Sequence, residues 1–64
     1  MQMKSYIDNE ILITLQGYGC KVLLNDWKEH GFIVEVLDAP VSSGYTTGDI
    51  VYISHSTPLT FQFI

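Results

Sequence analysis

Hydrophobic and polar residues alternate along most of the chain with a period of two, the pattern of β-strands that bury one face. The alternation is clearest over 10–16, 20–25 and 32–37. Turn-forming residues follow each run, so the pattern predicts three strands joined by short connections. Their expected inward faces are Ile11, Ile13 and Leu15, then Cys20, Val22 and Leu24, and finally Phe32, Val34 and Val36.

The connections between these runs contain glycine. Gly17-Tyr18-Gly19 predicts a tight turn, because two glycines around one residue permit the positive φ angles of a short hairpin. The polar segment 25–31 predicts a longer hairpin loop in which Gly31 takes the left-handed conformation. Segment 38–40 ends the third strand, since its proline cannot continue a central ladder, and 41–47 is small and polar, as in a loop.

Two more strands are expected in the last quarter of the chain. The run 50–53 is apolar on both faces, which predicts a central strand packed from both sides. A polar elbow over 54–58 breaks it, and the closing run 59–64 alternates again, with Leu59, Phe61 and Phe63 on one face. A closing strand must find a partner, and without one in its own chain its main-chain groups are a template for a second copy.

These elements predict a single all-β domain over residues 1–64, with a lead-in over 1–9 and five strands over 10–64. Five short strands in so few residues are too few for an ordinary two-sheet sandwich. They can curl into a small, strongly bent barrel of the SH3-like or OB-like kind. The lead-in is expected to be irregular or to form a short helical turn.

The size of the chain points to self-association. A domain of 64 residues buries only ~60% of its unfolded surface, so its folding margin is thin. The single cysteine excludes an internal disulfide, and only two histidines are present to bind a metal. With 47% hydrophobic and 16% charged residues, part of the surface is expected to be a subunit interface.

Charge and local chemistry exclude several function classes. The formal net charge of −4, with three lysines and no arginine, argues against binding duplex DNA along its backbone. No apolar run approaches the ~18 residues of a membrane span, and the N-terminus lacks the apolar core of a signal peptide. The cytoplasm is the expected location, which an unpaired cysteine fits.

No catalytic group of residues stands out. Cys20 falls on an inward face, where it is expected to act as a small hydrophobe rather than a nucleophile. His30, His55 and Asp26 match no compact metal-ligand spacing, and the carboxylates suggest no acid–base pair. The sequence therefore predicts no enzyme activity, no cofactor and no metal.

The order of strands and loops resembles the Sm and LSm (Hfq-like) proteins, a family of small five-stranded barrels. The resemblance spans 10–64: Ile11-x-Ile13-x-Leu15 before Gly17 is similar to the family's opening strand, and Asp26 matches an acidic residue of its first motif. The run 50–56 resembles the second motif, although Ser54 and His55 stand where the family usually has arginine and glycine. The second strand also lacks a glycine and the first turn is shorter, which suits a distant, phage-borne member.

The resemblance implies a ring of about five to seven copies, in which the last strand of each copy pairs with the fourth strand of the next. It also implies binding of single-stranded RNA or DNA through loops that face the pore, in nucleic-acid processing. The implied interface residues are Ile50, Tyr52, Leu59, Phe61 and Phe63. The implied nucleic-acid-binding residues are Asn25, Asp26, Trp27, Lys28, His30, Ser54, His55 and Ser56.

Plainer interpretations stand beside these. Trp27 can be a partly buried plug beneath a barrel loop instead of a stacking platform. His30 and His55 can simply satisfy turn hydrogen bonds. The alternative function is a structural or protein-interaction barrel, such as a phage assembly part, that does not bind nucleic acid.

Overall fold

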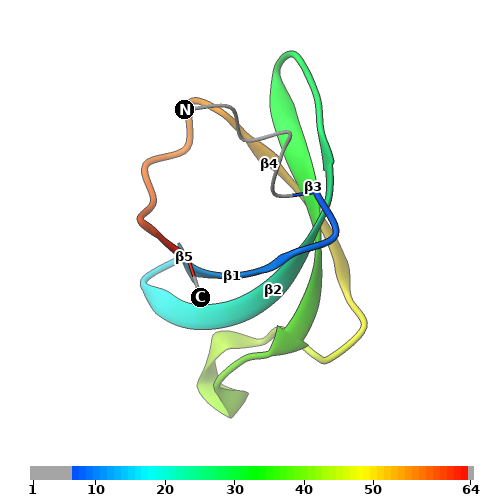
Figure 1. Ribbon diagram of the computed structural model, residues 1–64. Helices are drawn as coiled ribbons and strands as arrows, with labels where there is room; N and C mark the ends of the chain where they lie inside the picture. Colours follow the sequence, from blue (N-terminus) through cyan, green and yellow to red (C-terminus); the bar gives the residue numbers. More distant parts are fainter. Residues whose placement is uncertain (1–6, 64) are drawn as a thin grey trace.

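A computed structural model describes the backbone of residues 7–63 and the side chains of residues 7–62 (Figure 1). The expected strand end at Ile64 and most of the expected helical turn in the lead-in lie outside these residues. Within the described part, five antiparallel strands form one sheet in the order β4-β3-β2-β1-β5. The strands are β1 (Glu10–Leu15), β2 (Tyr18–Trp27), β3 (Gly31–Asp38), β4 (Ile50–Ser54) and β5 (Phe61–Phe63), with a 3-10 turn, η2, at Val41–Ser43.

The sheet curls strongly, and the two longest strands bend with it (Figure 1). The β2–β3 pairing shifts register between Lys21 and Val22 and again between Leu24 and Asp26. Such bulges increase the local twist and let a strand turn a corner. In residues 7–63, β4 and β5 are the two edges of the sheet and do not pair with each other. The expected all-β, SH3-like bent barrel is confirmed, with its sheet left open.

The core lies inside the curl and contains all nine predicted inward residues. Each large aliphatic side chain buried there contributes about 1.5–3 kcal/mol. Ile53 adds one residue from β4. The buried set is Ile11, Ile13, Leu15, Cys20, Val22, Leu24, Phe32, Val34, Val36 and Ile53.

The first hairpin turn lies one residue earlier than predicted. Leu15 pairs directly with Tyr18, so the loop is only Gln16 and Gly17, whose φ angles are 50° and 86°. Two consecutive positive φ angles are what a two-residue hairpin needs to match the twist of its strands. Tyr18 and Gly19 therefore belong to β2, and the prediction that they form the turn was wrong.

The second hairpin is also tighter than predicted. Strand β2 continues through the polar residues Asn25 and Asp26 to Trp27, which pairs with Phe32. The N–H of Lys28 donates to the carbonyl of Gly31 at 2.7 Å, which closes a connection over 28–30. Gly31 is the first residue of β3 and its φ is not positive, so its predicted left-handed conformation was wrong.

Gly31 is needed for a different reason. A Cβ built on it would lie 2.5 Å from the carbonyl oxygen of Ile53 and 2.5 Å from the ring of Tyr52. The Tyr52 ring therefore lies against the bare backbone of Gly31 on the outer face of the sheet. Glycine in a strand often marks such a close approach.

The prediction that the fourth strand is central was wrong, because β4 is an edge strand. Its apolar outward residues are not covered by a second layer: Ile50 is 61% exposed and Tyr52 is 55% exposed. Only Val51 and Ile53 face the core. The run is therefore apolar on both faces because one face is buried in the core and the other is apolar but exposed to solvent.

The closing strand finds a partner in its own chain. After the elbow, the chain crosses back so that β5 lies beside β1 (Figure 1), with Phe61 opposite Ile13. The hydroxyls of Thr14 and Thr60 lie 2.5 Å apart at the start of this pairing. The strand begins at Phe61 rather than at Leu59, which packs against the core instead. One edge of β5 is therefore satisfied, and the other remains open in the described part of the chain.

The connection between β3 and β4 is fixed by hydrogen bonds of its own. Gly44 and Gly48 have positive φ angles, as their place at the loop's bends predicts. Asp49 Oδ2 accepts from the N–H of Thr46 at 2.8 Å. The turn η2 in this loop is the one helical segment of residues 7–63, and no helix there is long and apolar enough to cross a bilayer.

Candidate nucleic-acid interface

Three rings gather where β2 ends, β3 begins and the elbow leaves β4. The centroids of Trp27 and Phe32 lie 5.0 Å apart with nearly parallel planes, and those of Trp27 and His55 lie 4.4 Å apart. The centroids of Phe32 and His55 are 5.9 Å apart, so the three rings form one cluster. Trp27 and Phe32 meet because they are directly opposite in the β2–β3 pair.

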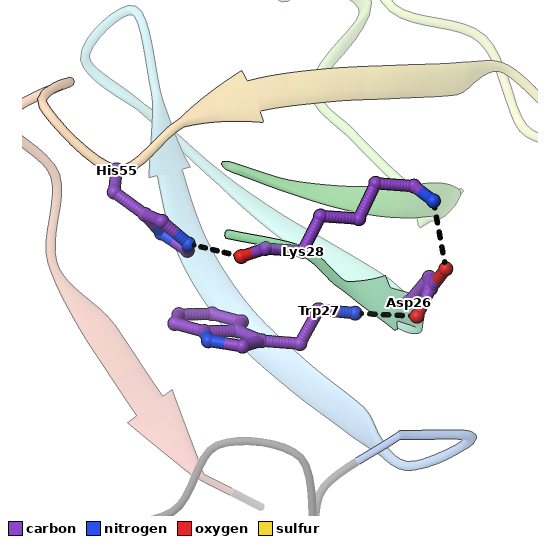
Figure 2. Close-up of polar contacts among 4 residues, drawn as sticks. All are labelled: Asp26, Trp27, Lys28 and His55. Carbon is purple, nitrogen blue, oxygen red and sulfur yellow. Dashed lines mark hydrogen bonds and ion pairs between the residues drawn. The ribbon is translucent and has the colours of Figure 1, made fainter. Parts of the chain in front are cut away.

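His55 is held in this cluster from both its backbone and its side chain. Its N–H donates to the carbonyl of His30 at 3.0 Å, which extends the β3–β4 ladder by one step. Its Nε2 lies 2.7 Å from the carbonyl oxygen of Lys28 (Figure 2). A carbonyl can only accept, so Nε2 carries the hydrogen and donates it. In neutral His55 the other ring nitrogen, Nδ1, is then a hydrogen-bond acceptor.

Asp26 and Lys28 form a polar pair beside the rings. Asp26 Oδ1 accepts from the N–H of Trp27 at 2.9 Å, and Asp26 Oδ2 lies 3.2 Å from Lys28 Nζ. Figure 2 shows the Lys28 side chain running away from His55 and Trp27 toward Asp26. Both charged groups are solvent-accessible, and such surface pairs contribute only about 0–1 kcal/mol. The ion pair therefore does little to fix the position of the Lys28 side chain.

An open hollow lies at this place, lined by Trp27, Lys28, Glu29 and His55. Trp27 is half-buried and also packs against the core. It therefore supports the hairpin as the predicted plug would, and it also forms part of the hollow's surface.

The structure brings together only part of the predicted site. Trp27, Lys28 and His55 line the hollow, and Asp26 lies directly behind them. Asn25 is half-buried in β2, and His30 is exposed on the hairpin connection. Neither of them lines the hollow.

Ser54 and Ser56 bind each other instead. Their Oγ atoms lie 2.9 Å apart, and Ser54 Oγ also accepts from the N–H of Ser56 at 3.2 Å. These hydroxyls shape the elbow that carries His55. They do not line the hollow beside Trp27.

Two residues of this region were missed by the sequence analysis. Phe32 supplies one ring of the cluster, and its predicted inward position opposite the end of the second strand was the available signal. Glu29 lines the hollow, but in the sequence it is one polar residue of a turn. Nothing in the pattern distinguishes it from a solvated carboxylate.

Four of the five predicted interface residues lie on the two edge strands of the described sheet. Ile50 and Tyr52 are exposed on β4, while Leu59 is half-buried and packs against the core. Phe61 is 39% exposed and its ring lies 5.6 Å from that of Phe32. The backbone of Phe63 pairs with Ile11, and its side chain lies outside the described part.

Cys20 is fully buried in the core, as its inward position predicts. Burial raises the pKa of its thiol, which keeps it in the unreactive protonated form. Among the described residues, no group of three or more histidine, cysteine, aspartate or glutamate side chains could hold a metal ion.

We expect Cys20 to resist a thiol reagent such as dithionitrobenzoate in the folded protein at mildly alkaline pH. The reagent needs an accessible thiolate, and Cys20 offers neither access nor ready ionisation. The measurement is the labelling rate, followed by absorbance, with protein unfolded in guanidinium as the control that reacts fully. Fast labelling with unchanged circular dichroism would contradict a closed core.

No protein-family model, curated protein or solved structure matches this chain. Within residues 7–63 the bent barrel is open and has two free edges. These edges and the hollow beside Trp27 are the grounds on which a function is proposed.

Proposed function

We propose that this protein is a divergent, cytoplasmic Sm-like protein that forms a ring and binds single-stranded RNA or DNA in nucleic-acid processing. The observation that carries the proposal is the convergence of Trp27, Lys28 and His55 on one solvent-open hollow. Aromatic and imidazole planes stack on unpaired bases, which contributes about 1–3 kcal/mol per base, and a lysine meets phosphate. In a ring each copy supplies one weak site, and a strand that contacts several copies binds more tightly than it binds one site.

The pattern of main-chain hydrogen bonds supports assembly through β4. In an antiparallel ladder, hydrogen-bonded and non-hydrogen-bonded pairs alternate. The bonds from Val36 to Asp49 and from His55 to His30 fix this alternation for the β3–β4 pair. It follows that the main-chain N–H and C=O groups that point away from β3 are those of Ile50, Tyr52 and Ser54.

The same reasoning applies to β5. The N–H of Thr14 donates to the carbonyl of Thr60 at 3.2 Å, so Thr60 and Gln62 face β1. The main-chain groups of Phe61 and Phe63 then point away from β1. Within the described residues 7–63, both edges therefore offer unpaired groups at alternate residues, which is the requirement for adding another antiparallel strand.

Pairing of β4 in one copy with β5 in the next joins two different surfaces. Such a heterologous contact closes into a ring when the repeated rotation allows it. The contact would also cover the apolar side chains of Ile50, Tyr52 and Phe61, which are exposed in the single chain. The resemblance to Sm proteins favours closure with about five to seven copies.

A second candidate is a structural or protein-interaction barrel that does not bind nucleic acid. The net charge of −4 and the pairing of Lys28 with Asp26 favour it, because both reduce attraction for phosphate. The free edges serve this candidate equally well. Binding measurements on the assembled protein separate the two.

The assembly is tested by solution mass. The protein is expected to form one closed species of several copies, and Ile50→Lys is expected to dissociate it by placing a charge at the edge of β4. Val41→Lys is the matched control, because Val41 is 99% exposed on η2 and belongs to neither edge strand. If the native protein is a monomer at micromolar concentration, the proposed ring is ruled out.

Nucleic-acid binding is tested by fluorescence anisotropy of short labelled single strands at low salt. His55→Ala is expected to weaken binding roughly tenfold, the effect of losing one stacking contact. Lys21→Ala is the control, because Lys21 pairs with Glu10 at 3.1 Å and does not line the hollow. Equal losses in both variants would indicate diffuse electrostatic attraction, and a ring that binds no strand would favour the structural barrel.

A further inference from the structure

We infer that the hollow beside Trp27 selects guanine, through the carboxylate of Glu29 and the ring of Trp27. This inference rests on the proposed binding of single-stranded nucleic acid. Its basis is the juxtaposition of an aromatic plane with an uncommitted carboxylate in one open hollow, where both residues contribute to the lining.

The two carboxylates near the hollow differ in what they already bind. Both oxygens of Asp26 are engaged, one by the N–H of Trp27 and one by Lys28 Nζ. Glu29 is exposed on the hairpin connection. Its side chain makes no hydrogen bond or ion pair with any residue of 7–62. Glu29 is therefore the carboxylate whose oxygens remain available to a ligand.

The other polar side chains of the hollow reinforce its acceptor character. His55 uses Nε2–H to bind the carbonyl of Lys28, so the Nδ1 of the neutral ring is an acceptor. The ammonium of Lys28 is drawn toward Asp26, away from the rings (Figure 2). A ligand that complements the hollow should therefore present hydrogen-bond donors at the edge of a flat ring.

Guanine fits this requirement best among the bases. Its Watson–Crick edge carries two adjacent donors, N1–H and the N2 amino group, which can meet the two oxygens of one carboxylate. Uracil has a single N3–H between two carbonyls, and those carbonyls would face the charge of Glu29. Adenine and cytosine each offer one amino group next to a ring nitrogen that only accepts.

The carboxylate also predicts how binding should depend on salt. The carboxylate of Glu29 repels phosphate and offsets the attraction of Lys28, so most of the affinity is expected to come from the base rather than from the backbone. Binding that neutralises few phosphates releases few counterions. We therefore expect a shallow dependence of affinity on salt concentration.

The test uses uridine-rich single strands with one central position changed to guanine, adenine, cytosine or inosine. The guanine strand is expected to bind roughly tenfold more tightly than the all-uridine strand, the usual effect of one bidentate contact to a base. Inosine lacks the N2 amino group and should lose most of that advantage. Anisotropy of the labelled strands gives the affinities.

Glu29→Gln tests the residue itself. The amide keeps one acceptor and removes the charge, so the guanine strand should bind more weakly and the all-uridine strand more tightly. The ratio of the two affinities should then approach one. Asp38→Asn is the matched control, since it removes one exposed charge at the end of β3, outside the hollow, and should leave the ratio unchanged.

The outcomes separate this inference from the function on which it rests. If all strands bind with equal affinity, guanine selection is overturned and single-strand binding stands. If the guanine preference survives in Glu29→Gln, the assignment to Glu29 is overturned. If no strand binds to the native protein, both the inference and the proposed function fail.

Discussion

Replacing Phe32 with alanine is expected to lower the free energy of unfolding by about 3–5 kcal/mol, the usual cost of truncating a buried aromatic side chain. Phe32 is 2% exposed, so the truncation leaves a cavity that the surrounding core cannot fill completely. Small domains have little stability in reserve. We therefore expect the Phe32→Ala protein to be largely unfolded at 25 °C.

Denaturation followed by far-ultraviolet circular dichroism measures this loss without depending on the fluorescence of Trp27. Val41→Ala is the control, because a 99% exposed side chain should change stability by no more than about 0.5 kcal/mol. Phe32→Leu keeps most of the volume and should cost less than about 1.5 kcal/mol. A cooperative Phe32→Ala transition with native stability would mean that Phe32 is not part of the core.

The rings around Phe32 connect this prediction to the proposed function. The ring of Phe32 lies 5.0 Å from that of Trp27, 5.9 Å from that of His55 and 5.6 Å from that of Phe61 in β5. The hollow and the free edge of β5 therefore share one supporting side chain. Phe32→Leu should fold. It is expected to change the position of Trp27 and to have little effect on the solution mass.

The sequence predicted the inward faces of the first three strands because burial with a period of two is local information. A shift of one residue would turn a whole face outward, so the positions of Ile11, Val22 and Val34 fix the register of each strand in the sheet. The bent barrel followed from the number and length of those strands. These features need no knowledge of distant contacts.

The sequence failed where a residue's role depends on a distant partner. The apolar outward residues of β4 predicted a central strand, but Tyr52 lies against Gly31 of β3, and Ile50 remains exposed on an edge. Gly31 itself was interpreted as a turn residue, the commonest use of glycine after a polar run. Its actual role is visible only when β3 and β4 are placed side by side.

The candidate site shows the same division. Trp27, Lys28 and His55 were named because the resemblance to Sm proteins implies that the loops carrying them meet. Phe32 and Glu29 were missed, since the direction of a side chain at a hairpin end depends on the length of the turn. Glu29 lies on the tight connection over 28–30, which is shorter than the predicted loop over 25–31, and it lines the hollow.

Gly31→Ala is expected to destabilise the protein by about 1–3 kcal/mol, the usual cost of overpacking. The added Cβ would lie 2.5 Å from the carbonyl oxygen of Ile53, and a backbone atom cannot move away as a flexible side chain can. Alanine also restricts the unfolded chain, which by itself would stabilise the protein by about 0.4–1 kcal/mol. The cost of the steric clash should exceed that gain, because the carbonyl oxygen of Ile53 and the Tyr52 ring must both shift.

Gly19→Ala is the matched control for this experiment. Gly19 also lies in a strand, its φ is not positive, and no atom lies within 4 Å of a Cβ placed there. Only the effect on the unfolded chain remains, so Gly19→Ala should be neutral or slightly stabilising. Denaturant midpoints of the two variants decide the matter: if Gly31→Ala matches Gly19→Ala, the Tyr52 ring does not pack on the backbone of β3. In that case Tyr52 is free to move, and its ring is not held in place beside the β4 edge that the proposed strand pairing would use.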